Sequence, residues 1–332
     1  MKHLLFHCLF VPALSIGFVF AQDTPKPDAP KPAEAKPADK PANAPKPADK
    51  PAPKPAEKKD APKKEEKKAE APAPAPATPQ VAVFKDKNLE AAVRRQVFAK
   101  RDSAEPLYAS DVENVSIIQG KKLKITDLSG LEKCTALAQL ELPDNEIKDI
   151  TPLKGLERLQ FIDLSHNQIA DIAVLETVKA LQYLELTGNK VSNITALGSI
   201  PALTSAYLAD NQIADATPLF KLPKLGSLYL DGNKVTSITG IGALKWLGML
   251  SLKDNQVTDI APLEPLGELR FLFLDNNKVS DIAPLHRALK KDLEGAREFA
   301  PYESIYLGGN PLSTESKKLV EEMKALHLRV SP

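Results

Sequence analysis

Cysteine is almost absent from this chain of 332 residues, which contains only Cys8 and Cys134. Cys8 belongs to an apolar N-terminal segment that we expect to be removed, so that Cys134 alone would remain. A single cysteine forms neither an intramolecular disulfide nor a cysteine metal cluster. Because Cys134 lies between Leu131 and Leu137, we expect its small thiol to pack in a core rather than to react.

An excess of charge of one sign is missing as well. The chain has 44 Lys and Arg against 43 Asp and Glu. In residues 22–80, 13 lysines oppose 10 acids, and in residues 81–332, 30 basic residues oppose 33 acids, which gives +3 and −3. Nucleic-acid binding usually needs a concentrated cationic face. We therefore expect no nucleic-acid partner.

The common catalytic motifs are also lacking. The sequence contains no Gly-x-Ser-x-Gly elbow, no His-Glu-x-x-His pair and no Walker loop. His166 is the one histidine that the sequence pattern brings near acids, Asp163 and Asp144, and solvated loop polarity explains this group. We therefore expect that the protein is not an enzyme and that it has no catalytic residue and no cofactor.

The N-terminal segment, residues 1–21, has the pattern of an export signal. A single early cation, Lys2, precedes a long apolar run, and the segment ends Val19-Phe20-Ala21, with small residues where a signal peptidase cuts. An uncleaved anchor is the alternative, because a run of about 17 residues approaches the lower limit for spanning a bilayer. We predict cleavage after Ala21, no integral membrane segment in the mature chain, and a secreted or cell-envelope location (periplasm or cell surface).

Residues 22–80 consist almost entirely of Pro, Ala, Lys, Asp and Glu, with near-repeats at 36–42 and 46–52. Such a composition supplies too few apolar side chains for a core and favours extended polyproline II, so we predict a disordered spacer. Fully extended, it would reach about 180 Å. Its lysines 63, 64, 67 and 68 are candidates for contact with an anionic cell-wall polymer, and a solvated charge run is the alternative.

A repeat of 22 residues dominates the rest of the chain. Its marker is an asparagine that follows a Leu-x-Leu type pattern, and the last spacing grows to 33. The asparagines are Asn145, Asn167, Asn189, Asn211, Asn233, Asn255, Asn277 and Asn310. The 11 extra residues fall within residues 285–300, where helix formers predict an enlarged convex helix; a partner-docking feature is the alternative.

Each repeat can be read as a short strand followed by two turns. Leu-x-Leu alternates inward and outward as a strand must, and stacked repeats would form a parallel sheet. The asparagine amide can donate and accept, which suits a turn with unpaired backbone groups inside each coil, so we predict a structural asparagine ladder. A second row of aspartates, which includes Asp149 and Asp171, is predicted to cap short helical turns rather than to bind calcium or another metal.

One repeat cannot bury its own apolar face, so the stack needs a lid at each end. Leu89, Val93 and Val97 recur every four residues, as on an amphipathic helix. Leu319 and Met323 mark a closing helix. We predict an N-terminal helical cap at 81–130, repeats at 131–312 and a C-terminal cap helix at 313–332.

These repeats resemble the bacterial leucine-rich-repeat proteins of the internalin type over residues 83–328, including the flanking sequences at 84–89, 125–131 and 309–312. The resemblance implies an α/β repeat fold, a right-handed curved solenoid with a parallel sheet on its concave face, which binds protein partners. No Leu-Pro-x-Thr-Gly sorting signal or immunoglobulin-like module follows the repeats. We therefore expect an envelope or secreted binding role rather than host invasion.

Strand alternation places two columns of side chains outward on the concave face. Of the 18 aromatic residues in the chain, seven fall in these columns, which favours an interface, although strand propensity alone is the alternative. Acids give the same face a negative edge, which favours a protein partner with basic and apolar patches; they are Glu141, Asp163, Glu185, Asp231 and Asp275. The candidate binding residues are Phe161, Asp163, Tyr183, Glu185, Tyr207, Tyr229, Asp231, Met249, Phe271, Phe273 and Tyr306.

The sequence thus predicts an exported binding module that captures a protein on its concave face, for adhesion, envelope scaffolding or recognition. A structural cell-envelope protein, held by its Pro/Lys-rich spacer, is the alternative.

Overall fold

A computed structural model of the chain describes residues 81–295 and 304–332. The predicted signal peptide and spacer, and the end of the predicted convex helix, lie outside these residues. No helix in the described ranges is both long enough and apolar enough to cross a membrane.

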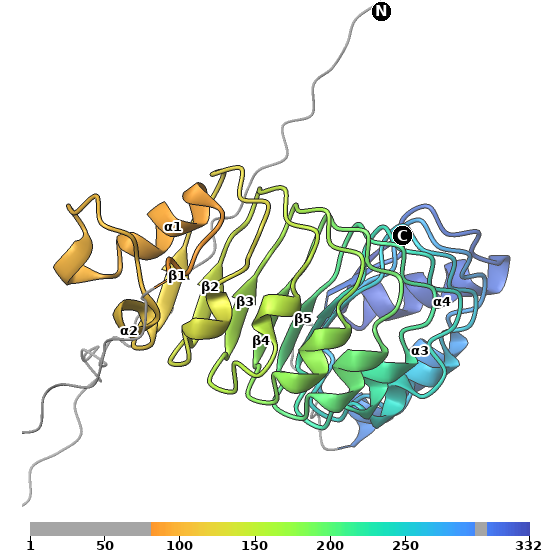
Figure 1. Cartoon of the computed structure of the whole chain (residues 1–332). Coiled ribbons are helices and arrows are strands. Elements are labelled where there is room, and N and C mark those ends of the chain that lie inside the picture. The colour runs from red at the N-terminus through yellow and green to blue at the C-terminus, as the bar shows by residue number, and fades with distance from the viewer. Residues whose placement is uncertain (1–80, 296–303) are drawn as a thin grey trace, which may run out of the picture. The chain divides into compact units, whose positions relative to one another are not determined.

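In these ranges, ten strands of three residues form one parallel sheet, and they follow each other in sequence order (Figure 1). Most neighbouring strands pair with a register offset of one repeat, as in Phe161 beside Tyr183. The strands are β1 Ile117–Gln119, β2 Gln139–Glu141, β3 Phe161–Asp163, β4 Tyr183–Glu185, β5 Ser205–Tyr207, β6 Ser227–Tyr229, β7 Met249–Ser251, β8 Phe271–Phe273, β9 Ser304–Tyr306 and β10 Arg329–Ser331.

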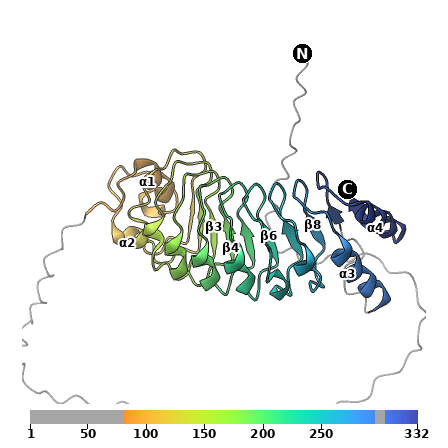
Figure 2. The same ribbon diagram turned by 90° about the vertical axis from the view of Figure 1, so that its right-hand side faces the viewer.

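Short 3-10 turns close the coils on the convex side, opposite the sheet (Figures 1 and 2). The aspartates predicted as caps accept a hydrogen bond from the first N–H of the next turn, for example Asp149 from Thr151 at 2.8 Å and Asp171 from Ala173 at 2.8 Å. These bonds satisfy donors that a turn leaves unpaired. The turns are η2 Leu131–Lys133, η3 Thr151–Leu153, η4 Ala173–Thr177, η5 Thr195–Ser199, η6 Thr217–Lys221, η7 Ile241–Ala243 and η8 Ala261–Leu263.

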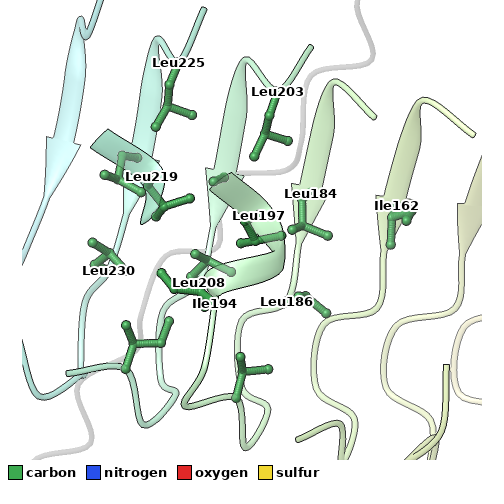
Figure 3. Packing of buried hydrophobic residues seen from close by; sticks show 14 of the residues in the cluster. Ile162, Leu184, Leu186, Ile194, Leu197, Leu203, Leu208, Leu219, Leu225 and Leu230 are labelled. Atoms are coloured by element: carbon green, nitrogen blue, oxygen red, sulfur yellow. The ribbon is translucent and has the colours of Figure 1, made fainter. Parts of the chain in front are cut away.

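The inward side chains of all coils merge into one continuous apolar core (Figure 3). Leu184 on β4, Leu197 on the convex turn η5 and Leu208 directly after β5 come from neighbouring coils, and each is fully buried. Burying one such leucine contributes about 1.5–3 kcal/mol. Because this core extends from Phe84 to Val330, residues 81–332 carry all that a solenoid needs to fold by itself.

The asparagines form the predicted ladder, and its bonds run between amide and backbone rather than between amides. Asn233, 7% exposed, donates to the carbonyl oxygens of Leu208 and Leu230 at 2.9 and 3.0 Å and accepts from the N–H of Ile213 at 2.9 Å. Leu208 and Ile213 belong to the preceding coil, so each amide joins two coils. The same pattern recurs at the other asparagines, and Asn310 repeats it across the longer interval.

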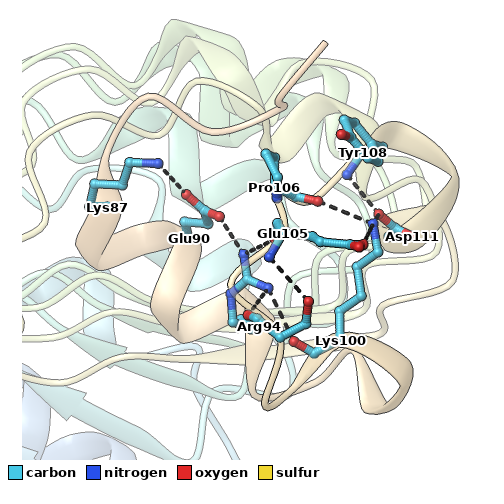
Figure 4. A network of polar contacts seen from close by, with 9 residues as sticks. Lys87, Glu90, Arg94, Lys100, Glu105, Pro106, Tyr108 and Asp111 are labelled. Atoms are coloured by element: carbon cyan, nitrogen blue, oxygen red, sulfur yellow. Dashed lines mark hydrogen bonds and ion pairs between the residues drawn. The ribbon is translucent and has the colours of Figure 1, made fainter. Parts of the chain in front are cut away.

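The N-terminal cap is held by a polar network (Figure 4). The cap contains α1 Lys87–Arg94, η1 Phe98–Lys100 and α2 Ala109–Val112. The buried Glu90 binds Arg94 at 2.5 Å, and Arg94 donates to the carbonyl of Ser103 at 2.9 Å. Lys100 pairs with Asp111 at 2.9 Å. The network therefore fixes the loops over the first coil.

The sheet is longer than the predicted repeat region of 131–312, which is a correction to the predicted cap boundaries. β1 lies in the segment predicted as a helical cap, and its Ile118 is fully buried beside Leu140. At the other end α4 Thr314–Ala325 forms the predicted helix, and β10 then returns to pair with β9. The predicted convex helix is present as α3 Ala283–Glu294.

Candidate protein-binding site

The strand registers place the candidate residues in the two predicted columns. The first column contains Phe161, Tyr183, Ser205, Ser227, Met249 and Phe271, and the second contains Asp163, Glu185, Tyr207, Tyr229, Ser251, Phe273 and Tyr306. The residues between them in sequence, such as Leu184 and Leu228, are fully buried. The side chains of both columns are therefore the ones that the sheet presents outward.

Four aromatic rings form a continuous row across strands β3 to β6. Phe161 stacks on Tyr183 with ring centroids 4.2 Å apart, and Tyr207 stacks on Tyr229 at 4.7 Å. A tilted contact of 5.2 Å between Tyr183 and Tyr207 joins the two pairs, so the row passes from the first column to the second. All four rings are half-buried, so part of each ring remains accessible on the face.

A second stack lies farther along the same face. Phe273 and Tyr306 have ring centroids 4.7 Å apart, and the ammonium of Lys253 lies 5.0 Å from the ring centre of Phe273. Between the two stacks the second column holds Ser251, only 2% exposed. This small residue carries no ring, so the aromatic contacts are interrupted between Tyr229 and Phe273.

The acids at the N-terminal part of the face are crowded. Asp163 and Glu185 occupy neighbouring strands in register, where side chains lie about 5 Å apart. Burial, and then the charge of Asp163, raise the pKa of Glu185 to about 7, although its hydrogen bond from the N–H of Thr187 at 2.8 Å opposes this shift. A cation bound at this pair would relieve the repulsion between the carboxylates.

Asp231 lies on the same face but its carboxylate is already used within the fold. It accepts hydrogen bonds from the hydroxyl of Ser251 and from the N–H of Lys253, while burial raises its pKa. Asp275 likewise accepts from the N–H of Gly308 at 3.1 Å. These two predicted contributors to the acidic edge are thus fixed by neighbouring coils.

Two of the three tyrosine hydroxyls in the row, those of Tyr183 and Tyr207, are available as donors. Burial raises the pKa of Tyr183, Tyr207 and Tyr229, in the case of Tyr229 to about 12, so all three remain protonated at neutral pH. The Tyr229 hydroxyl contacts the sulfur of Met249. Within residues 81–295 and 304–332, the hydroxyls of Tyr183 and Tyr207 have no hydrogen-bond partner.

The other chemical groups singled out from the sequence are not gathered into a site. In the described part of the chain, His166 is exposed and its imidazole bonds to neither Asp163 nor Asp144; Asp163 instead accepts from Ser165. Burial raises the pKa of the Cys134 thiol to about 12, and this cysteine is fully buried, which confirms the packing role. No three His, Cys, Asp or Glu residues in these ranges are arranged to hold a metal ion.

Two features were missed in the sequence: Lys253 on the face, and Trp246 at a turn outside the two columns. Lys253 adds a cation to the C-terminal stack, and its position in the repeat, two residues before an asparagine, is the signal that could have shown it. Trp246, the only tryptophan of the chain, is 68% exposed at the turn before β7. The preceding coils have Ala180, Ala202 and Lys224 at that position, so a large aromatic there departs from the repeat.

Comparisons with known proteins agree with this architecture. The family model described as leucine-rich repeats (2 copies) matches residues 157–199. Internalin C2 from Listeria monocytogenes is 28% identical, with a TM-score of 0.58 over 64% of this chain and 95% of that one. A leucine-rich-repeat protein of Leptospira interrogans shares the fold at 21% identity, with a TM-score of 0.50 over 63% of this chain and 58% of that one.

No curated protein sequence matches the chain. The continuous core, the asparagine ladder and the likeness to internalin C2 together support a leucine-rich-repeat solenoid that is similar to the bacterial internalins.

Proposed function

We propose that this chain is an exported binding module that captures a protein partner on its concave face. The observation that carries the proposal is the row of four contacting aromatic rings from Phe161 to Tyr229. Partly exposed aromatic side chains provide large contact area with little loss of conformational entropy, and they are enriched at interface hot spots. Curved solenoids offer extended concave surfaces of this kind to partners.

The acids on the face indicate the charge of the partner. Asp163 and Glu185 lie beside the first aromatic stack, so the partner has basic groups next to apolar ones. Residues 1–21 direct export and residues 22–80 separate the module from its attachment point, which gives a secreted or cell-envelope location. Catalysis forms no part of the proposal, because solenoids of this type typically serve as binding scaffolds.

The proposal is tested by partner capture from envelope extract with residues 81–332 as bait. Changing Tyr207, Tyr229 and Phe273 together to Ala removes half of the six stacked rings, with at least one from each stack, and should abolish capture. Trp246→Ala, which removes an exposed ring off the two columns, is the matched control and should leave capture unchanged. Thermal unfolding of each variant shows whether the fold persists; undiminished capture by a folded triple variant would refute the site.

A further inference from the structure

The row of rings from Phe161 to Tyr229 sets the direction of its ligand. It crosses strands β3 to β6 and shifts from the first column to the second between Tyr183 and Tyr207, and its extent across the strands is three strand spacings, about 14 Å. A ligand strand aligned with β4 or β5 would cover only one or two rings. Covering the whole row requires an extended segment that runs across the strands.

The half-buried tyrosines of the row set the chemistry that this segment presents. The hydroxyls of Tyr183 and Tyr207 are donors without a partner in the described ranges, and they lie on neighbouring strands. A ligand backbone that offers free carbonyl oxygens at short intervals would accept from both. Polyproline II has this property, because it has no internal hydrogen bonds and its carbonyls point outward.

The spacing of the sheet agrees with the same conformation. Polyproline II repeats every three residues, about 9.3 Å, and two strand spacings are about 9.6 Å. Equivalent ligand residues would therefore meet equivalent positions on alternate strands. In the second column Asp163 lies two strands from Tyr207, and Glu185 lies two strands from Tyr229. A cationic side chain over the acids would place the residue three positions away over the tyrosines.

We propose that the ligand of this face is a proline-rich segment of a partner protein, bound in polyproline II conformation across β3 to β6, with a lysine or arginine at Asp163 and Glu185. The inference rests on the proposed function and specifies the partner. Charge complementarity fixes which end of the segment carries the cation, because acids border the row at β3 and β4 whereas its tyrosines continue to β6. A proline ring three residues from the cation lies against Tyr207 or Tyr229, and stiff proline reduces the entropy lost on binding.

A fluorescent peptide of three Lys-Pro-Ala-Pro units is the probe, titrated into residues 81–332. This fragment carries the complete core and omits residues 22–80, which have a composition similar to the probe. We expect saturable binding. The double variant Tyr183→Phe and Tyr207→Phe keeps the ring stack and loses only two hydroxyls, which should weaken binding about tenfold. Tyr108→Phe, which removes a hydroxyl from the N-terminal cap next to α2, is the matched control and should change affinity less than about twofold.

Three further probes and variants decide the chemistry. Replacing each proline of the peptide by glycine should weaken binding about tenfold or more, because the flexible chain must be ordered. Replacing each lysine by glutamine should weaken binding to the unaltered protein and make no difference with the variant Asp163→Asn and Glu185→Gln.

Equal affinity for the proline and glycine probes, undiminished binding by the double tyrosine variant, or no binding up to about 1 mM, would each overturn the inference. Failure of the probe while the extract partner is still captured through Tyr207, Tyr229 and Phe273 would leave the proposed function standing. Probe binding without capture from extract would contradict the function and support the peptide specificity.

Discussion

Glu185 illustrates how a single side chain at the face is set by its neighbours. Its carboxylate lies in the electrostatic neighbourhood of Tyr183 and Asp163, and burial is the largest cause of its raised pKa. In the unfolded chain the same group has a value near 4.5. The native state therefore binds more protons than the unfolded state between about pH 4.5 and pH 7.

Linkage then gives the sign of the effect on stability. A raised carboxyl pKa contributes stability that is complete below pH 4.5 and is lost as the pH rises to about 7. We predict that Glu185→Gln is about 1–2 kcal/mol more stable than the unaltered chain at pH 8, and that the difference vanishes at pH 4. Urea unfolding across this range measures it. Glu141→Gln, two strands away in the same column, is the matched control, and a pH-independent difference for Glu185→Gln would contradict the argument.

At the scale of the elements, the asparagine turn is the joint between coils. Asn233 provides bonds to the backbone of two coils within the core. We predict that Asn233→Ala lowers the free energy of unfolding by about 2–4 kcal/mol, because the N–H of Ile213 and the carbonyl of Leu208 lose their partner away from water. Chemical denaturation checks the value. The control is the exposed Asn193, whose side chain accepts a hydrogen bond from the N–H of Thr195. Asn193→Ala should lower the free energy of unfolding by about 1 kcal/mol. Equal losses for the two variants would show that the ladder does not add to stability.

The regular coils could be predicted from the sequence because one pattern states both which side chains are buried and where the chain turns. The first coil could not. Leu123 stands where the later coils have asparagine, and Gly120 replaces the second core leucine. A Cβ on Gly120 would lie 3.0 Å from side-chain atoms of Leu123 and Leu142, so the leucine fills the space that a regular repeat would use. β10 has no repeat signature at all.

The two columns of the candidate binding face could be predicted from the sequence, but the contacts between their side chains could not. Register follows from the 22-residue period, and the pairs Phe161 with Tyr183 and Glu185 with Tyr207 lie where the period places them. Ring stacking across columns and the use of Asp231 by Ser251 depend on side-chain rotamers. The period carries no information on rotamers, so these contacts needed the three-dimensional structure.

At the scale of the whole molecule, the proposal of export predicts a shorter mature chain. Expression in a host with a Sec pathway should yield a protein outside the cytoplasm whose first residue is Gln22, because the small residue Ala21 completes the cleavage pattern. N-terminal sequencing together with intact mass measures the cut. Ala21→Leu, which removes the small side chain, should block processing at this position, and a secreted product that retains Met1 would favour the anchor alternative.

The coil-to-coil joints also determine how the molecule would respond to tension. Each coil contacts mainly its two neighbours, and the same amide-to-backbone bonds recur at every junction. Pulling on the two ends would therefore strip coils from the stack in turn instead of breaking the core at once. Each released repeat of 22 residues would add about 70 Å of contour length. The protein would therefore lengthen under force in steps of equal size and dissipate the applied work repeat by repeat.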